Sequence, residues 1–278
     1  MKDAFLDGRS VALSISTSPD LRVLGLSTEH VEDAMAEIAR HLMACGAALA
    51  YGGDLREGGF TELLFEIVNR YRANKDSEKI LVKNYLAWPV HASMDVARIE
   101  ALQQALKTLA QLILLTPSGK EIELTKRPAA PQEPSGEDWV KGLTAMRMTM
   151  ASKIAARIAL GGATTGYKGK LPGIAEESLI QLQRKAPLFL VGGFGGCAYD
   201  LTCVMGLNRR GLPRSKVDQD WNGLELFRGY RPADLHNGLT ADENQRLAET
   251  AHIDEAVTLI LRGLLRIVGK HTRRRRKT

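Results

Sequence analysis

Residues 156–196 read ARIALGGATTGYKGKLPGIAEESLIQLQRKAPLFLVGGFGG, and this stretch contains a complete strand–helix–strand unit. The apolar run at 156–162 predicts a buried strand that ends in two glycines. A helix is expected over about 174–184, and a second buried strand at 186–193 again ends in glycines. Two buried strands joined by a helix indicate a parallel sheet that helices cover on both faces.

The same alternation continues on both sides of this unit. Further strands are expected at 9–17, 47–53, 79–89 and 111–116. Further helices are expected from Thr28 to Gly46 and at about 61–73, 94–108, 137–154, 196–207 and 251–269. The chain is therefore predicted to adopt a Rossmann-like α/β fold, an open and mostly parallel sheet with helices on both faces.

Two segments interrupt the alternation of strands and helices. Residues 117–136 hold four prolines and are predicted to form a loop or a short hairpin. Residues 209–239 are rich in glycine, proline and asparagine, and we expect an ordered insertion there. For a chain of 278 residues, these patterns predict one domain over 1–269, followed by a basic tail at 270–278.

The composition is that of an ordinary globular protein, with 44% apolar and 25% charged residues. No run approaches the roughly 18 consecutive apolar residues of a membrane span, and the first residues lack the apolar stretch of a secretory signal. The three cysteines cannot form a complete disulfide framework, and neither they nor the six histidines have metal-ligand spacing. We expect a soluble, cytoplasmic protein with no membrane partner, no metal and no cofactor.

The formal net charge of +6 comes from one end of the chain. Residues 270–278 read KHTRRRRKT and contain six lysines and arginines, while the rest of the chain holds 32 basic and 32 acidic side chains. A protein that reads nucleic acid would be expected to carry a basic stripe across its fold instead. The tail is interpreted as a solvated terminus, or as a weak and salt-dependent contact for nucleic acid or a protein partner.

Three strands are predicted to end in paired glycines, at Gly52–Gly53, Gly161–Gly162 and Gly192–Gly193, and Gly195–Gly196 follows the last pair. In an open α/β sheet, ligands bind beyond the carboxyl ends of the strands. Glycine permits positive φ and close approach of the backbone, and a helix that begins directly afterwards offers free N–H groups to a phosphate. A single pair is more often a tight turn than a phosphate site, but three pairs at one edge of the sheet favour a phosphate-binding site.

Two common classes of nucleotide enzyme are excluded by their missing motifs. No G-x-G-x-x-G precedes an acidic ribose ligand, and no G-x-x-x-x-G-K-[ST] occurs, which excludes a Rossmann dehydrogenase and a P-loop ATPase. The candidate ligand-binding residues lie in or beside the glycine turns. They are Ser16, Thr17, Gly52, Gly53, Asp54, Gly58, Gly59, Thr61, Glu62, Arg147, Gly161, Gly162, Lys168, Gly192, Gly193, Phe194, Gly195, Gly196 and Asp200.

Several charged candidates have more than one interpretation. Arg147 lies among methionines in a predicted helix, so it is either an ordinary surface arginine or a buried one with a phosphate or carboxylate partner. Asp200 can bind a ribose hydroxyl or cap its own helix, and Lys168 lies in a glycine-rich loop that suits closure over an anion. Glu176 and Glu177 are candidate catalytic residues, but acids also favour the first turn of a helix because of its dipole.

Five sequence motifs together resemble those of the SLOG superfamily. They are S-I-S-T-S, A-Y-G-G-D-x-x-x-G-G-F-T-E-L, R-I-A-L-G-G, P-G-I-x-E-E and L-V-G-G-F-G-G, within residues 9–207. That superfamily consists of Rossmann-like domains related to the cytokinin-activating LOG enzymes and to the Smf/DprA proteins. The chain is most similar in pattern to members found in bacterial antiviral defence operons, which are often joined to TIR effector domains. The resemblance implies that the glycine-lined pocket binds a nucleotide-derived signal, such as an ADP-ribose or cyclic nucleotide species.

One departure from the family pattern bears on catalysis. The LOG enzymes carry P-G-G-x-G-T-x-x-E, whose glutamate acts in hydrolysis of an N-glycosidic bond, whereas residues 191–199 read VGGFGGCAY here. The resemblance therefore favours a ligand sensor. In the alternative, a hydrolase or transferase acting on a nucleotide N-glycosidic bond, Glu176 or Glu177 replaces the missing glutamate as general acid or base.

Partners are expected from the same resemblance. No TIR, nuclease or membrane effector is recognisable in the sequence, so any effector is expected to be a separate protein. We expect a homo-oligomer, because most soluble oligomers are symmetric assemblies of identical chains. A third hypothesis, weaker than the other two, is a nucleic-acid role through the basic tail and the likeness to Smf/DprA.

Overall fold

The sheet is built from short apolar strands, as the sequence predicts. The computed structural model describes residues 4–53, 55, 58–72, 80–128, 130–215 and 221–275. Within these residues, six parallel strands form one sheet in the order β4-β3-β2-β1-β5-β6. The strands are β1 (Ser10–Ser16), β2 (Ala48–Tyr51), β3 (Val82–Leu86), β4 (Ala110–Leu114), β5 (Ala156–Gly161) and β6 (Leu188–Val191). Nearly all of their residues are buried, as is typical of a parallel sheet with both faces covered.

The order of the strands reverses next to β1. From β1 the chain builds β2, β3 and β4 toward one edge, and it then crosses back to place β5 and β6 on the other side of β1. Ser16 lies opposite Gly161 where β1 and β5 end. Ligands of open α/β sheets bind outside the carboxyl ends of the strands at such a reversal. The space beyond Ser16 and Gly161 is therefore where the fold favours a ligand site.

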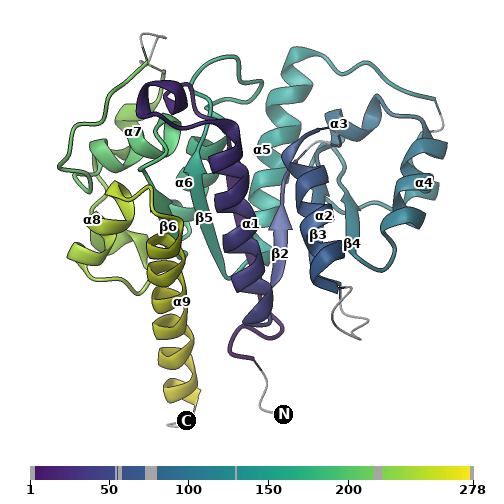
Figure 1. Cartoon of the computed structure of the whole chain (residues 1–278). Helices are drawn as coiled ribbons and strands as arrows, with labels where there is room; N and C mark the ends of the chain where they lie inside the picture. Colours follow the sequence, from purple (N-terminus) through teal and green to yellow (C-terminus); the bar gives the residue numbers. More distant parts are fainter. Residues whose placement is uncertain are drawn as a thin grey trace.

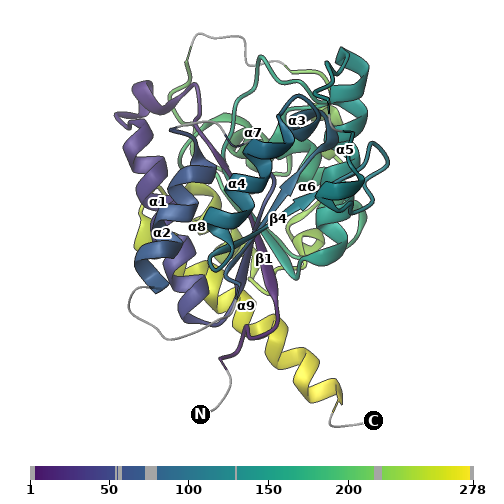
Figure 2. The ribbon, with the colours of Figure 1, turned by 90° about the vertical axis from the view of Figure 1, so that its right-hand side faces the viewer.

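Helices cover both faces of the sheet, which confirms the predicted open α/β fold. They are α1 (Thr28–Ala44), α2 (Phe60–Arg72), α3 (Trp88–Ala92), α4 (Val96–Leu106), α5 (Gly136–Lys153), α6 (Gly173–Gln183), α7 (Gly196–Val204), α8 (Ala241–Glu249) and α9 (Ile253–Arg275). Figure 1 shows α1 and α9 crossing in front of the sheet, and Figure 2 shows the sheet between α1 and α2 on one side and α5 and α6 on the other. Side chains of β1 alternate accordingly, because Leu13 packs in the core with α1 and α9, whereas Ala12 packs with methionines of α5.

Three elements differ from the sequence prediction. The short helix α3 begins at Trp88, where the sequence predicts a strand that ends at Pro89; proline is well suited to the first turn of a helix. Helix α8 lies in a region with no predicted element. Helix α9 continues to Arg275, so the first part of the predicted basic tail continues the last helix. Among the described helices, none combines the length and apolarity needed to cross a bilayer.

Both interrupting segments contain short 3-10 turns. In the first, a turn at Leu124–Lys126 follows an isolated antiparallel bridge between Leu115 and Glu121, which fits the predicted loop or short hairpin. The described part of the second contains turns at Leu224–Phe227 and Pro232–Leu235. Trp221 and Phe227 pack edge to face in this insertion, with ring centroids 6.3 Å apart, and both belong to an apolar cluster that includes residues of β6 and α7.

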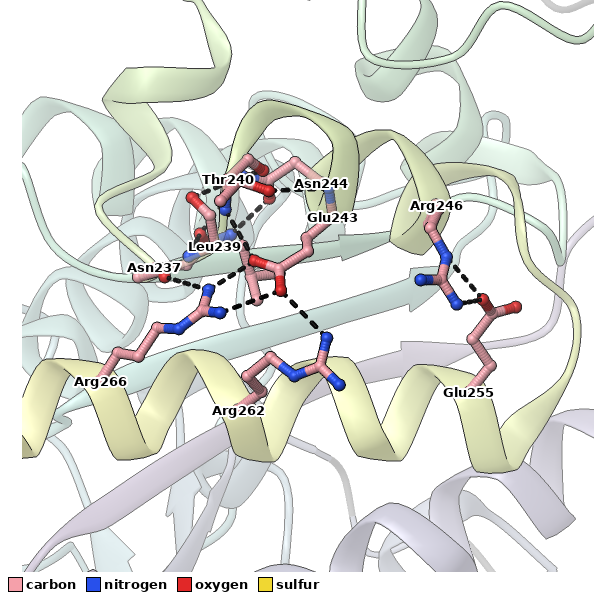
Figure 3. A network of polar contacts seen from close by, with 10 residues as sticks. Asn237, Leu239, Thr240, Glu243, Asn244, Arg246, Glu255, Arg262 and Arg266 are labelled. Atoms are coloured by element: carbon pink, nitrogen blue, oxygen red, sulfur yellow. Dashed lines mark hydrogen bonds and ion pairs between the residues drawn. The ribbon is translucent and has the colours of Figure 1, made fainter.

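Helix α9 is held against α8 by a charged network that centres on Glu243 (Figure 3). The Glu243 carboxylate accepts hydrogen bonds from Arg266 at 2.5 and 3.1 Å and from Arg262 at 3.0 Å. It also accepts from the backbone N–H of Thr240 at 2.9 Å, which completes the capping box of α8. A separate ion pair joins Arg246 to Glu255 nearer the start of α9. Glu243 therefore caps one helix and pairs with the next.

Replacing Glu243 by glutamine should lower the free energy of unfolding by about 1–2 kcal/mol at pH 7, because a cap and two ion pairs are weakened together. The arginines, Arg266 first, lower the pKa of Glu243 to about 2 from the ordinary 4.5. A depressed carboxylate pKa contributes stability above the unfolded pKa, and this contribution disappears as the pH falls through the folded pKa. The difference between wild type and variant should therefore shrink from pH 4.5 toward pH 2 in urea unfolding curves. An equal difference in the free energy of unfolding at pH 7 and at pH 2.5 would contradict this role of Glu243. The control is Glu255→Gln, which removes one partner of the more exposed Arg246–Glu255 ion pair.

Candidate functional site

A cavity of about 170 Å³ lies at the carboxyl ends of β1, β2 and β5, where the strand order reverses. Helices α5 and α6 and the loop between β5 and α6 complete its walls. Its lining residues are Leu13, Ser14, Ile15, Ser16, Tyr51, Gly52, Arg147, Gly162, Ala163, Tyr167, Gly173, Ile174 and Glu177. Five predicted site residues meet here, from four separate parts of the chain, namely Ser16, Gly52, Arg147, Gly162 and Glu177.

Arg147 extends from α5 into this site and is almost completely buried. Its Nη1 pairs with Glu176, whose second carboxylate oxygen accepts from the Thr144 hydroxyl. A Cβ atom at Gly173 would lie 3.2 Å from Arg147 Nη2, and one at Gly169 would lie 2.6 Å from Nη1, so these glycines leave room for the guanidinium. Among the described residues, none accepts a hydrogen bond from Nη2, which leaves a cationic donor at the cavity. The carboxylate partner predicted for Arg147 is present, and it is Glu176.

Glu177 belongs to a second buried network. Its Oε2 accepts from the Ser14 hydroxyl at 2.5 Å and pairs with Arg157 Nη1 at 2.9 Å. Arg157 Nη1 also donates to Ser14 Oγ at 2.6 Å, so the three side chains form a closed triangle. Burial lowers the pKa of the Arg157 guanidinium, and the Glu177 carboxylate opposes that shift. No described residue donates to Oε1 of Glu177.

The two candidate catalytic glutamates therefore have different surroundings. Glu177 lines the cavity and keeps one oxygen without a partner among the described residues. Glu176 uses both oxygens on Thr144 and Arg147 and does not line the cavity. Of the two, Glu177 is placed to contact a ligand, and Glu176 is placed to orient Arg147.

Ser14 and Arg157 were not among the predicted site residues. Both lie inside strands that the sequence marks as buried, with Ser14 in β1 and Arg157 in β5. A charged side chain within an otherwise apolar strand is rare without a partner, because the charge must be taken out of water. That rarity was the available signal, although the identity of the partner depends on how α6 packs across the sheet.

The glycines after β5 allow that strand to end against β1. Gly161 has a φ of +68°, and a Cβ there would lie 2.3 Å from the Ser16 carbonyl oxygen. The Gly162 N–H donates to the same carbonyl at 3.1 Å, and Cys197 N–H donates to the Gly162 carbonyl at 3.0 Å. The turns that follow β5 and β6 are therefore in direct contact, as predicted for one edge of the sheet.

The glycines after β6 pack against the chain itself. A Cβ at Gly192 would lie 2.3 Å from the Ala248 carbonyl oxygen, and one at Gly193 would lie 2.1 Å from that of Thr250. The N–H of Gly196, at the start of α7, donates to the Asp20 carboxylate at 2.8 Å. The helix N-terminus predicted to hold a phosphate thus holds an internal carboxylate instead, and Phe194 beside it is buried.

Asp20 and Asp200 share one arginine from the 209–239 insertion. Arg214 pairs with Asp20 at 2.9 Å and with Asp200 at 2.5 Å. Asp200 also accepts from the Trp221 indole N–H at 3.0 Å, and Asp20 accepts from the Ser215 N–H at 2.8 Å. Burial raises the pKa of Asp200, and the bonds from Arg214 and Trp221 oppose this shift. Asp200 therefore joins the insertion to α7 and does not line the cavity.

The other predicted residues lie outside the cavity. Glu62 accepts from the Gly58 N–H at 2.6 Å, and Lys168 stacks on Trp139 with its Nζ 3.9 Å from the ring centroid. Gly53 packs beside Tyr51 and Thr61, Gly59 precedes α2, and Thr17 is exposed. Asp54 lies outside the described residues.

A larger and mostly apolar cavity, of about 500 Å³, lies between α2 and α4. Thr61 and Glu62 line it beside leucines, Phe65 and Arg98, so these two predicted residues are separated from Arg147 and Glu177. Charged groups that suit a phosphate and a sugar face the smaller cavity, and we assign the candidate site there. Over the described part of the chain, no three histidine, cysteine or acidic side chains gather closely enough to hold a metal ion.

Comparison with known proteins agrees with the fold. No curated protein matches the sequence. The sequence model of the family described as SLOG cluster 2 matches residues 5–225, a span that includes every residue of the cavity. The chain therefore belongs to the SLOG family, and it contains a domain of the kind that binds or processes nucleotide-related molecules.

Proposed function

We propose that the protein binds a nucleotide-derived small molecule in the cavity between β1, β5 and α6, and that it acts as a sensor in antiviral defence signalling. One observation carries the proposal: Arg147 and Glu177 line the same cavity at the reversal of strand order, each with polar atoms not used by described residues. An ADP-ribose-like molecule or a cyclic nucleotide carries the two kinds of group that this pair can bind.

The two side chains suit different parts of such a ligand. Arginine is well matched to phosphate oxygens, because its planar guanidinium presents several donors. A carboxylate oxygen only accepts, so Glu177 Oε1 is suited to a ribose hydroxyl. The cavity, at about 170 Å³, is smaller than the roughly 300–1,000 Å³ of typical ligand pockets. It therefore fits the phosphate and sugar, and the base would extend toward the mouth.

Sensing requires that the bound ligand changes another surface. The cavity is closed on one side by the loop between β5 and α6, which includes Ala163 and Tyr167. A ligand that contacts this loop can change the position of α6, and through it the surface offered to a second copy or to a separate effector protein. The homo-oligomer and the effector are parts of this proposal.

A second candidate function is cleavage or transfer at a nucleotide N-glycosidic bond. Glu177 follows Gly173 by four residues at the start of α6, which is the spacing of the glycine and glutamate in the LOG pattern G-T-x-x-E. This position favours Glu177, and not residue 199, as the general acid or base of the cleavage or transfer reaction.

A ligand screen tests the proposal. AMP, ADP-ribose and cyclic dinucleotides are added to the full chain, and thermal stability and binding heat are measured. A ligand at 100 times its Kd should stabilise the fold by about 2.7 kcal/mol. Released base is measured in the same samples by chromatography. Release of base by wild type that is abolished in Glu177→Gln would support the second candidate function, cleavage or transfer at an N-glycosidic bond. Absence of binding by every nucleotide would contradict both functions, and Glu62→Gln, which alters only the cavity between α2 and α4, should bind like wild type.

A further inference from the structure

Arg157 is an unusual residue for the interior of a sheet. Its side chain is completely buried, yet its Nε and Nη2 atoms have no hydrogen-bond partner among the described residues, whereas Nη1 contacts Ser14 and Glu177. A buried cation with unsatisfied donors costs free energy and adds little net stability even when paired. Such departures from good packing are expected where a residue serves a site.

The contacts of Arg157 and Ser14 converge on a single oxygen. Arg157 Nη1 reaches both Ser14 Oγ and Glu177 Oε2, and the Ser14 hydroxyl donates to that same Oε2. Because Ser14 accepts from Arg157, its own hydrogen is directed toward Glu177. Both contacts hold Oε2, so Oε1 is the oxygen that the described residues leave available to a ligand in the cavity that Glu177 lines.

We infer that Ser14 and Arg157 are positioning residues, which hold Glu177 so that its one unengaged oxygen selects a ligand with a hydroxyl donor, that is, a ribose in preference to a deoxyribose. The inference rests on the proposed nucleotide binding for its ligand, but its contacts exist without one. A site built to accept a hydroxyl disfavours the analogue that lacks it, because a buried charged acceptor then loses its partner. Arg157 and Ser14 act through Glu177 and do not themselves need to touch the ligand.

The ligand arm of the test compares AMP with 2′-deoxy-AMP and 3′-deoxy-AMP by calorimetric titration. For wild type, at least one deoxy analogue should bind about 10- to 100-fold more weakly than AMP. In Ser14→Ala this ratio should fall several-fold. The matched control is Ser178→Ala, because Ser178 is a buried serine next to Glu177 whose hydroxyl bonds to no residue that the structure describes. Ser178→Ala should keep the wild-type ratio, and an equal ratio in wild type and Ser14→Ala would overturn the inference.

A second arm needs no ligand and separates the two proposals. Unfolding equilibria are measured for wild type, Arg157→Met, Glu177→Met and the double variant. Arg157→Met should raise the unfolding constant about 100- to 1,000-fold when Glu177 is present, because the carboxylate is left uncompensated, and by less than about 10-fold when it is absent. Equal effects in the two backgrounds would overturn the inference even if no nucleotide binds. If wild type binds none of the three nucleotides while the coupling is present, the proposed ligand is wrong and the positioning of Glu177 stands.

Discussion

Replacing Asp20 by alanine is expected to lower the free energy of unfolding by about 3–5 kcal/mol. Asp20 is fully buried, its two oxygens accept from Gly196 N–H and Ser215 N–H, and it forms an ion pair with Arg214. Alanine leaves the start of α7 without its acceptor and leaves Arg214 paired with Asp200 alone. The loss combines a helix cap, a backbone contact of the insertion and half of a shared ion pair. Chemical denaturation at pH 7 measures it.

The matched control is Asp234→Ala. Asp234 also accepts a backbone N–H, from Arg231 at 2.7 Å, but it does so at the surface of a short 3-10 turn. Its replacement should cost about 1 kcal/mol. Equal losses for the two variants would show that the Asp20 network contributes no more than an ordinary cap, and the account of α7 given above would then be wrong.

Replacing Arg147 by methionine should weaken binding of phosphate-bearing nucleotides by roughly 100-fold or more, since a buried charged partner of the phosphate is lost. It should also destabilise the fold by about 3 kcal/mol, because Glu176 is left buried beside Thr144 alone. The double variant Arg147→Met/Glu176→Met removes both charges and should recover most of the stability without recovering affinity. Calorimetric titration with AMP and ADP-ribose, beside denaturation curves, separates the two effects.

Lys168→Met is the control for a general loss of positive charge near the site. Lys168 is exposed and stacks on Trp139, so its replacement should change affinity by less than about threefold. A larger loss for Lys168→Met than for Arg147→Met would show that the loop, and not the buried arginine, binds the phosphate.

The fold was predictable because its signals are local. Apolar runs of four to seven residues predict the strands, and the helical periods between these runs predict the helices. The parallel sheet follows from the alternation of strands with helices. Part of the site was predictable for the same reason, since Ser16 ends a strand, Gly162 follows one, and Arg147 is flanked by apolar residues. The strand order, which makes β1 and β5 neighbours, cannot be read from a local pattern.

The remainder of the site depends on contacts between distant residues. A paired glycine indicates close approach without showing what approaches: at Gly192 it is the carbonyl of Ala248, and at Gly195 it is the side chain of Asp20. Ser14 and Arg157 meet Glu177 only because β1 pairs with β5 beneath α6. Sequence patterns therefore predicted the edge of the sheet at which the cavity lies, the carboxyl ends of the strands. They could not separate the turns that the chain itself fills from the cavity that remains.

The most direct test of the account is a crystal structure of the full chain with AMP at saturating concentration. We expect electron density for the nucleotide in the cavity that Arg147 and Glu177 line. Its phosphate should bond to Arg147 and a ribose hydroxyl to Glu177, while Asp20 still accepts a hydrogen bond from the Gly196 N–H. Density for the phosphate at Gly195–Gly196 with Asp20 displaced, or for the nucleotide between α2 and α4, would contradict it.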